Sequence, residues 1–533
     1  MAGTLGAFGL GLTAWSYGDS AGSAVASRFV GLTLVVAAAL TVFAPSTRAA
    51  LSDLRRAARA ATGAGERWHL TVLLGVVVIG VWVRARFAGQ SFRFDEASTF
   101  MNYAIAPLDD GLSEYPVPGN HLLHTFVQHM SWRMFGDGPL AVRLPALLAG
   151  VAIIPAVYAA GRALYDRETG LVAAGLAAAS AALVEYSVNA RGYTMVFLAV
   201  IALVPLGLYA LERRSPAAAL GWALVSALAL YTVPVAVYGV GIIVAWAVLK
   251  LVDEPPRLRL VLFAGIGATL AATAVLTYLL YRPVVGEPGW DYVHSQVTEH
   301  FVRSIYEAFH SGWPAPLWVL LGIGVAAAVV LHPQIARQRA PLWLAAAVVL
   351  PLAIAVTPRV PPFVRSWLFL LPLYLVLASA GLVALGRLAL RSRPDWLPRA
   401  AGATAIVAAL GLGATMREAD LPNGDDPPLR DGDVVTRYLR EEFEPGDGLA
   451  VGLFTQPAFS YHFRREGFDP GPMTPGPVVS RVEPKPGHRT LLVDTFTRGS
   501  GPPEKALGAE NARVLKRFRW AVVYEVPPVG TAR

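Results

Sequence analysis

Long apolar runs recur along most of the chain, and each is long enough to cross a hydrocarbon core of roughly 30 Å. Of the 533 residues, 55% are hydrophobic and only 15% are charged, whereas a soluble protein of this size carries far more charge. The runs do not alternate apolar and polar residues as the strands of a membrane barrel do. The sequence therefore predicts a polytopic α-helical membrane protein.

Twelve candidate spans can be placed on these runs. They are 28–45, 69–87, 139–160, 170–185, 192–211, 217–231, 234–251, 259–281, 314–331, 341–357, 366–386 and 400–415. The first 17 residues are predicted to form either a thirteenth, short membrane segment or a peripheral one, because they lack the basic n-region of a cleavable signal.

Arginines cluster in the short loops between the runs, for example in 46–68 and 386–399. The positive-inside rule assigns such loops to the cytoplasmic side of the plasma membrane. It then places 88–138, 282–313 and everything after 416 on the extracytoplasmic side. This distribution also accounts for the net charge of +8, so we expect no nucleic-acid partner.

The composition changes from about residue 416. A Pro/Asp/Gly linker, "LPNGDDPPLRDGD", is followed by helix-like stretches that alternate with strand-like ones such as "GLAVGLF", "RTLLVDTF" and "RWAVVYEV". Such alternation predicts a small α/β domain. We therefore expect a transmembrane domain over 1–415 and a small extracytoplasmic α/β domain over 416–533.

Two adjacent carboxylates, Asp95 and Glu96, lie in "FRFDEAS" (92–98) just past the end of a span, in the loop 88–138. In one interpretation they are solvated or cap an interfacial helix. In the other they do acid/base chemistry at the membrane surface, where one deprotonates a hydroxyl and the other positions a partner. Further along the loop, the apolar stripe of 119–136 predicts a helix in the membrane interface.

Two arginines, Arg191 and Arg365, lie at the outer ends of predicted spans. The guanidinium fork binds phosphate well, and an arginine close to the bilayer is costly unless it is paired. The alternative is that each side chain only reaches out to lipid headgroups. Glu185, at the outer end of another span, is expected to pair with Arg191.

Metal chemistry is restricted by the composition. The chain has no cysteine, which excludes disulfides, thiol catalysis and cysteine metal sites. His121, His124 and His129 have a spacing compatible with zinc, but contacts to water or backbone are the simpler interpretation. A divalent cation held by Asp95 and Glu96 is a further alternative, and no cofactor is assigned.

Three segments, taken in order, carry a resemblance to a known family. They are "FRFDEAST" (92–99), "EYPVPGNHLLH" (114–124) and the stretch from "GPLAVRLPALLAG" to "NARGYTM" (138–195). Together they resemble the first half of the GT-C glycosyltransferases, and more narrowly the branch of protein O-mannosyltransferases and bacterial aminoarabinose–lipid A transferases. The resemblance is good over about 90–210 and does not extend past 416. Many relatives carry a His-Pro-Pro segment where this chain has "YPVPGNHLLH".

The resemblance implies an enzyme that passes a hexose or pentose, with inversion, from a polyprenyl-phosphate carrier to an extracytoplasmic protein, lipid or cell-wall glycan. It implies Asp95 as the base, and Glu96 as a residue that orients the acceptor or the loop, or holds a cation. Arg191 and Arg365 would bind the phosphate, with Tyr193 as a supporting donor. The pocket for the acceptor or the sugar would be lined by Asn120, His121 and His124.

The main rival interpretation is a transporter or flippase of a lipid-linked or cell-envelope substrate, which also has about twelve spans. Transporters place ionisable groups in the middle of spans, often near Gly/Pro breaks in matched halves. Here the notable charges lie at outer helix ends and in loops, and the two halves show no internal repeat. The sequence therefore favours the enzyme.

Overall fold

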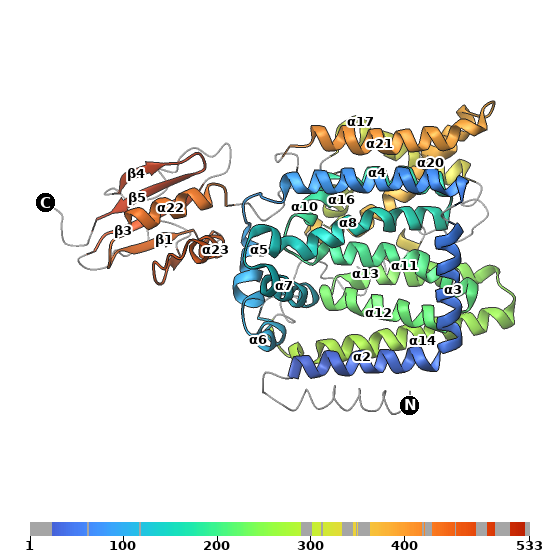
Figure 1. Cartoon of the computed structure of the whole chain (residues 1–533), viewed down its shortest axis with the longest axis horizontal. Coiled ribbons are helices and arrows are strands. Elements are labelled where there is room, and N and C mark those ends of the chain that lie inside the picture. Colours follow the sequence, from blue (N-terminus) through green and yellow to red (C-terminus); the bar gives the residue numbers. More distant parts are fainter. Residues whose placement is uncertain are drawn as a thin grey trace.

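A computed structural model gives the fold as a helical bundle with a small sheet domain at one end (Figure 1). The described residues are 24–60, 63–116, 119–288, 301–310, 313–332, 345–347, 349, 363–417, 421, 429–452, 455–475, 488–495 and 512–527. Most of them are helical, as a polytopic α-helical membrane protein requires.

Seven helical stretches in the described part are long and apolar enough to cross a membrane. They are built on α4 (Ala64–Phe87), α8 (Pro139–Leu164), α11 (Tyr193–Arg213), α13 (Ala236–Lys250), α14 (Pro256–Tyr281), α20 (Leu370–Ala389) and α21 (Leu397–Thr415). Two shorter apolar helices, α12 (Pro216–Thr232) and α17 (Ala315–Leu331), lie among them.

Two further pairs of helices reach the length of a span only together, because each is bent at a short break. The pair α2 (Ala24–Val42) and α3 (Ala44–Ala60) is bent by 87°, and the pair α9 (Arg167–Ala178) and α10 (Ala181–Ser187) by 62°. Each predicted span except 341–357 coincides with one of these helices or pairs. Most of 341–357, and the first 17 residues, lie outside the described residues.

The bend between α9 and α10 is stabilised by an arginine from α4. The fully buried Arg84 donates from Nη1 to the carbonyl of Ala178, at 2.9 Å, and from Nε to Ser187 Oγ, at 3.0 Å. At the same break Ser180 caps α10 by accepting from the N–H of Leu183. Buried backbone groups freed by a break need such partners, since lipid offers none.

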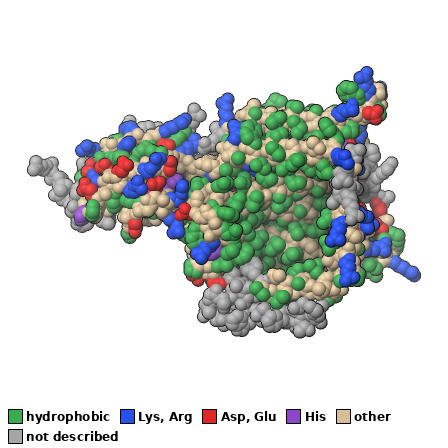
Figure 2. Space-filling view, viewed as in Figure 1, with side chains coloured by type: hydrophobic (Ala, Val, Ile, Leu, Met, Phe, Trp, Pro, Cys, Tyr) green, Lys and Arg blue, Asp and Glu red, His purple; other side chains and the backbone are tan. Residues whose placement is uncertain are grey.

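The other bend places α3 across one end of the bundle (Figure 1). Asp53 of α3 accepts from the hydroxyl of Tyr209 at 2.9 Å, near the end of α11. Ser46, also of α3, bonds the hydroxyl of Ser215 at 2.9 Å, the residue that caps α12. A belt of hydrophobic side chains covers the middle of the bundle, and Lys and Arg gather towards the edge where α3 lies (Figure 2). The belt is what contact with lipid chains requires.

The predicted loop 88–138 folds at the opposite end of the bundle into four short helical segments. They are α5 (Phe94–Thr99), the π-helix η1 (Phe100–Ala104), α6 (Leu108–Ser113) and α7 (Leu122–Phe135). The helix predicted over 119–136 is observed as α7. Two more segments complete this end, α16 (Phe301–His310) and the 3₁₀ turn η4 (Val364–Ser366).

The C-terminal part is a five-stranded sheet with two helices. Its elements are α22 (Gly432–Glu442), β1 (Gly448–Val451), α23 (Gln456–Glu466), β2 (Thr474–Pro475), β3 (Thr490–Thr495), β4 (Arg513–Arg517) and β5 (Ala521–Val526). The strand order is β2-β1-β3-β5-β4, with β1 parallel to β2 and β3, and β5 antiparallel to β3 and β4. The predicted fold class is confirmed. The division into two domains at 415/416 stays a prediction.

Candidate active site

Asp95 lies at the end of the bundle opposite α3 (Figure 1), in the first turn of α5, and meets two arginines from distant parts of the chain. Its carboxylate Oδ2 lies 3.4 Å from a terminal nitrogen of Arg365 and 3.7 Å from one of Arg191. The Asp95 side chain keeps 23% of its surface exposed, whereas the two arginine side chains keep 15% and 5%. The carboxylate is therefore the accessible member of the cluster.

Arg191 is held in place from several sides. Its Nη1 donates to Thr99 Oγ1 at 2.8 Å and to the backbone carbonyl of Asp95 at 3.2 Å. Its Nη2 lies 3.1 Å from Nε2 of His121. These contacts bring the turn after α10, the helix α5 and the start of α7 together around one guanidinium.

Arg365, on η4, donates from Nε to the hydroxyl of Tyr193 at 3.2 Å. Its guanidinium also lies 4.3 Å from the ring centroid of Phe363. Burial acts to lower the pKa of Arg365, but the neighbouring Tyr193 and Asp95 raise it above its ordinary value. Arg365 is therefore a permanent cation held by Tyr193, which accepts its Nε–H. The role of Tyr193 as a supporting donor to the phosphate stays a prediction.

The two predicted histidines are both buried beside the arginines. Burial, and then the charge of Arg191, lower the pKa of His121 well below its ordinary value and that of His124 to about 3. Both rings are therefore neutral at physiological pH. Among the described residues, the cluster then contains two guanidinium cations and the carboxylate of Asp95, an excess of positive charge that suits an anion.

The ring of His121 faces two donors, because the N–H of Gly192 donates to Nδ1 at 2.9 Å and Arg191 approaches Nε2. A neutral imidazole has only one nitrogen that accepts, so one of these donors is left poorly satisfied. The close approach needs a glycine, since a Cβ at position 192 would lie 2.5 Å from Cγ2 of Thr232 and 3.2 Å from the ring Nδ1. His124, in turn, has no hydrogen-bond partner for either ring nitrogen among the described residues.

Glu96 lies in a different environment from that of Asp95. It is fully buried, and its two carboxylate oxygens accept from Arg143 of α8, at 2.5 Å to Nη2 and 3.0 Å to Nε. It also accepts from the backbone N–H of Arg93 and of Ala190, both at 3.0 Å. These contacts favour the loop-orienting one of the three roles predicted for Glu96, which stays a prediction. With both oxygens bound by Arg143, Asp95 and Glu96 do not form a joint ligand pair for a cation.

Arg143 and Arg93 are residues of the candidate site that sequence analysis missed. Arg143 also donates from Nη1 to the carbonyls of Ala88 and Gln90, at 2.8 and 2.7 Å, so it fixes the segment that leads to Asp95. Arg93 forms a buried ion pair with Glu185 at 2.8 Å. The expected pairing of Glu185 with Arg191 is therefore wrong. A charged residue near the start of an apolar span was the available signal for Arg143.

Asn120 is buried with its amide fully engaged in the loop. It donates to the carbonyls of Gly111 and Glu114 at 2.8 and 2.9 Å, and it accepts from Thr125 at 2.7 Å. These bonds favour a loop-holding role over contact with a sugar. Among the described residues, no group of three His, Asp or Glu is placed to hold a metal ion.

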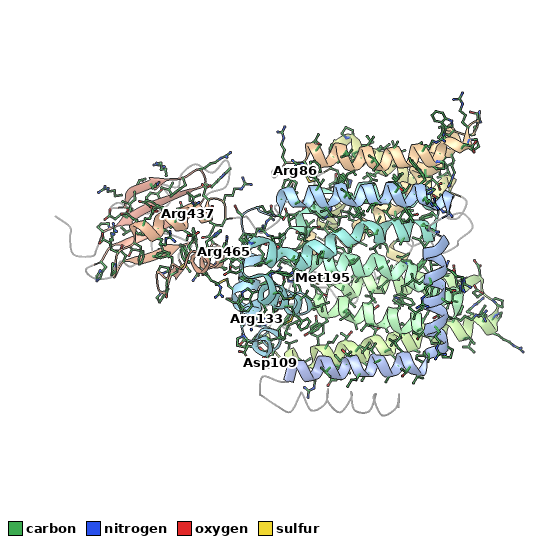
Figure 3. The ribbon with its side chains drawn as sticks, viewed as in Figure 1. Arg86, Asp109, Arg133, Met195, Arg437 and Arg465 are labelled. Carbon is green, nitrogen blue, oxygen red and sulfur yellow. The ribbon has the colours of Figure 1, made fainter. Side chains whose placement is uncertain are left out.

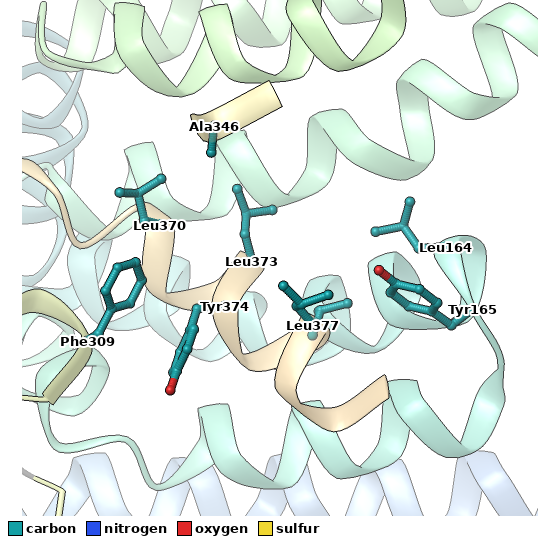
Figure 4. Close-up of a pocket in the computed structure, with 9 residues that line it drawn as sticks. Leu164, Tyr165, Phe309, Ala346, Leu370, Leu373, Tyr374 and Leu377 are labelled. Atoms are coloured by element: carbon teal, nitrogen blue, oxygen red, sulfur yellow. The ribbon is translucent and has the colours of Figure 1, made fainter. Parts of the chain in front are cut away.

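An apolar groove of about 120 Å³ follows α20 (Figure 4). It is lined by Leu164, Tyr165, Phe309, Ala346, Leu370, Leu373, Tyr374, Val376 and Leu377. Several of these side chains are only half-buried, so the groove opens on the surface of the bundle. The helix α20 begins shortly after η4, and α16, which carries Phe309, packs against both. The groove therefore leads away from the element that carries Arg365.

Comparisons with known proteins agree with the fold. Residues 118–281 match the family described as dolichyl-phosphate-mannose-protein mannosyltransferase. The fold is similar to that of ArnT from Cupriavidus metallidurans, solved in the apo state and bound to undecaprenyl phosphate. For each, the TM-score is 0.55 at 14% identity, over 87% of this chain and 99% of that chain.

The apo oligosaccharyltransferase of Archaeoglobus fulgidus is more distant, with a TM-score of 0.48 and 12% identity over 81% of this chain and 70% of that chain. No curated protein matches the chain significantly. The family match and the shared fold with ArnT confirm the resemblance seen in the segments between 92 and 195. Residues 118–281 thus resemble the dolichyl-phosphate-mannose-protein mannosyltransferase family, and the chain shares the fold of ArnT.

Proposed function

We propose that this protein transfers a hexose or a pentose from a polyprenyl-phosphate donor to an extracytoplasmic acceptor, with inversion. The observation that carries the proposal is the position of Asp95, an accessible carboxylate between Arg191 and Arg365 at the outer end of the bundle. The acceptor is the hydroxyl of a protein, a lipid or a cell-wall glycan.

The donor phosphate is assigned to Arg191 and Arg365. Two fixed guanidinium groups with one carboxylate between them carry an excess positive charge, which a phosphodiester anion neutralises. The apolar groove along α20 supports an isoprenoid chain for this donor, because its lining includes Leu370, five residues after Arg365, and is hydrocarbon and aromatic. ArnT, which has the same fold, was solved with undecaprenyl phosphate, so we extend this class of ligand to the present chain.

Asp95 is assigned as the base. A hydroxyl is a poor nucleophile at neutral pH, and a carboxylate that takes its proton as it attacks removes this limitation. The acceptor oxygen bonds to the anomeric carbon while the bond from that carbon to the phosphate oxygen breaks. The phosphate leaves with the electron pair, and Arg191 and Arg365 stabilise its charge. An arriving phosphate competes with Asp95 for the two arginines and so frees the carboxylate for the acceptor.

The site is assigned to the extracytoplasmic face of the plasma membrane. This orientation is supported by the arginine-rich loops, which lie at the opposite end of the bundle and are cytoplasmic by the positive-inside rule. Because the chain has no cysteine, a single Asn102→Cys substitution in η1 reports the side directly. A membrane-impermeant maleimide should label the new cysteine in intact cells. Labelling only after permeabilisation would show the opposite orientation.

The test uses purified full-length protein with radiolabelled polyprenyl-phosphate hexoses and pentoses. Asp95→Asn should keep donor binding but lower turnover by about 10²–10⁴-fold, the usual contribution of a general base. Arg191→Ala and Arg365→Ala should weaken donor binding. The control is Glu114→Gln, an exposed carboxylate of the same loop, which should behave as wild type. If Asp95→Asn turns over normally and neither arginine variant loses donor affinity, the transporter interpretation takes precedence.

A further inference from the structure

The hydrophobic core of the C-terminal sheet domain continues into the segment that carries Asp95. One cluster of buried side chains joins Phe92 and Phe100, which flank Asp95 in sequence, to Phe459 and Phe463 of α23 and to residues of β1, β3 and β5. The sheet domain is therefore packed on the loop of the candidate active site and is not a free appendage. The sequence left its role open.

Tyr461 of α23 is the central contact of this junction. It is fully buried, and its ring stacks on Phe92 with centroids 3.8 Å apart and meets Phe100 edge-on at 5.8 Å. Its hydroxyl donates to the backbone carbonyl of Asp137 at 2.9 Å, just before α8. A single side chain of the sheet domain thus contacts the residues just before and just after α5, and the segment that leads into α8.

Further contacts fix the same junction. The backbone N–H of Leu429 donates to the carbonyl of Phe92 at 2.8 Å, and Arg464 lies 3.6 Å from the carboxylate of Asp137. Figure 3 shows Arg465 of α23 and Arg133 of α7 at the boundary between the sheet domain and the bundle. The boundary therefore combines stacking, backbone hydrogen bonds and an ion pair.

The position of Phe92 is coupled to the carboxylates. Its ring centroid lies 4.5 Å from the guanidinium carbon of Arg143, which in turn binds both oxygens of Glu96. The helix α5 has only six residues, and an isolated helix of that length is unstable in water. Its position must come from its neighbours, of which Arg143 is one and Tyr461 is another.

We propose that the sheet domain, through α23, positions the catalytic loop, and that Tyr461 is a positioning residue for Asp95. This inference rests on the proposed function of Asp95 as the base. Its physical basis is the sensitivity of proton transfer to geometry, since a misplacement of about 1 Å can lower a rate by about 10²-fold.

The kinetic test compares Tyr461→Leu, Tyr461→Phe and Tyr438→Leu in the full chain. Tyr461→Leu removes the stacking on Phe92, so kcat should fall by about tenfold or more, with KM for the donor unchanged. Tyr461→Phe keeps the stacking and should retain most of kcat. The matched control Tyr438→Leu changes an aromatic contact within the sheet domain, to Phe518 at 5.7 Å between centroids, and should leave kcat unchanged.

A second readout does not depend on activity. A spin label on Asn102→Cys, in η1 directly after α5, reports the mobility of the loop in a chain that otherwise has no cysteine. Tyr461→Leu should increase that mobility, and Tyr438→Leu should not. An immobile label and a normal kcat in Tyr461→Leu would overturn the inference. If wild type itself has no transferase activity, the proposed function fails, while the label still decides whether α23 fixes the loop.

Discussion

Adjacent carboxylates in this chain have opposite physical roles. Asp95 stays accessible between two arginines, whereas Glu96 is fully buried and bound at both oxygens by Arg143. Successive residues of a helix point about 100° apart, so a one-residue step moves a side chain from the open face of α5 to its buried face. Under the proposed function, Asp95 is therefore the group for chemistry and Glu96 the group that holds the loop.

This division predicts different effects of two conservative substitutions. Glu96→Gln leaves the Arg143 guanidinium buried without its counter-charge, which should lower the free energy of unfolding by roughly 3–5 kcal/mol. Asp95→Asn should lower turnover with little loss of stability. Thermal unfolding in detergent measures the difference, with Glu114→Gln as the exposed control. Equal stability of the Glu96→Gln variant and wild type would contradict the role of Glu96 in anchoring the loop.

At the scale of helices, the bend between α9 and α10 determines how the end of the bundle that carries Asp95 is built. The short helix α10 leads directly into the turn that carries Arg191, and Arg84 of α4 bonds the carbonyl of Ala178 at the break. A straight helix would direct the following residues elsewhere. The arginine in α4 is thus a structural support for the turn that positions Arg191.

Arg84→Leu is expected to destabilise the bundle, because it leaves the buried carbonyl of Ala178 without its side-chain donor. One unsatisfied buried group costs about 1–3 kcal/mol. Arg391→Leu, at an exposed position after α20, is the matched control and should change little. The unfolding temperature in a fixed detergent and lipid mixture is the measurement. Unchanged stability of Arg84→Leu would mean that water or another donor bonds the carbonyl of Ala178.

Hydropathy and charge predicted most of the helices, because both depend on local sequence. The run 170–185 was expected to be one span, and it is α9 and α10 with a 62° bend between them. A hydropathy average has no direction, so it does not detect a bend. The partners of the charged residues also could not be predicted from the sequence. No local sequence pattern indicates that Arg143 binds Glu96, or that Glu185 pairs with Arg93 and not with Arg191.

For the whole molecule, the junction between the bundle and the sheet domain contains a buried histidine. The ring of His462 meets Phe92 edge-on at 6.5 Å. Burial, the largest effect, lowers the pKa of His462 from 6.5 to about 4, with Asp433 opposing the shift and Arg465 adding to it. Between those two values the unfolded chain binds a proton that the folded chain does not.

The free energy of unfolding should therefore rise with pH across this window. The contribution of His462 is fully present above about pH 6.5 and is lost as the pH falls towards about 4. Unfolding followed between these pH values should show a steeper dependence in wild type than in His462→Leu. His488→Leu, which changes an exposed histidine of the same domain, should keep the slope of wild type. Parallel curves for wild type and His462→Leu would contradict the assignment.

The groove along α20 has a consequence for how the proposed donor reaches the site. Its half-buried lining opens on the surface of the bundle, so an isoprenoid chain can enter sideways from the bilayer without passing through water. The concentration that sets the rate is then the number of donor molecules per lipid molecule. Diluting the donor with extra phospholipid, at constant bulk concentration, should slow transfer, whereas diluting whole vesicles with buffer should not.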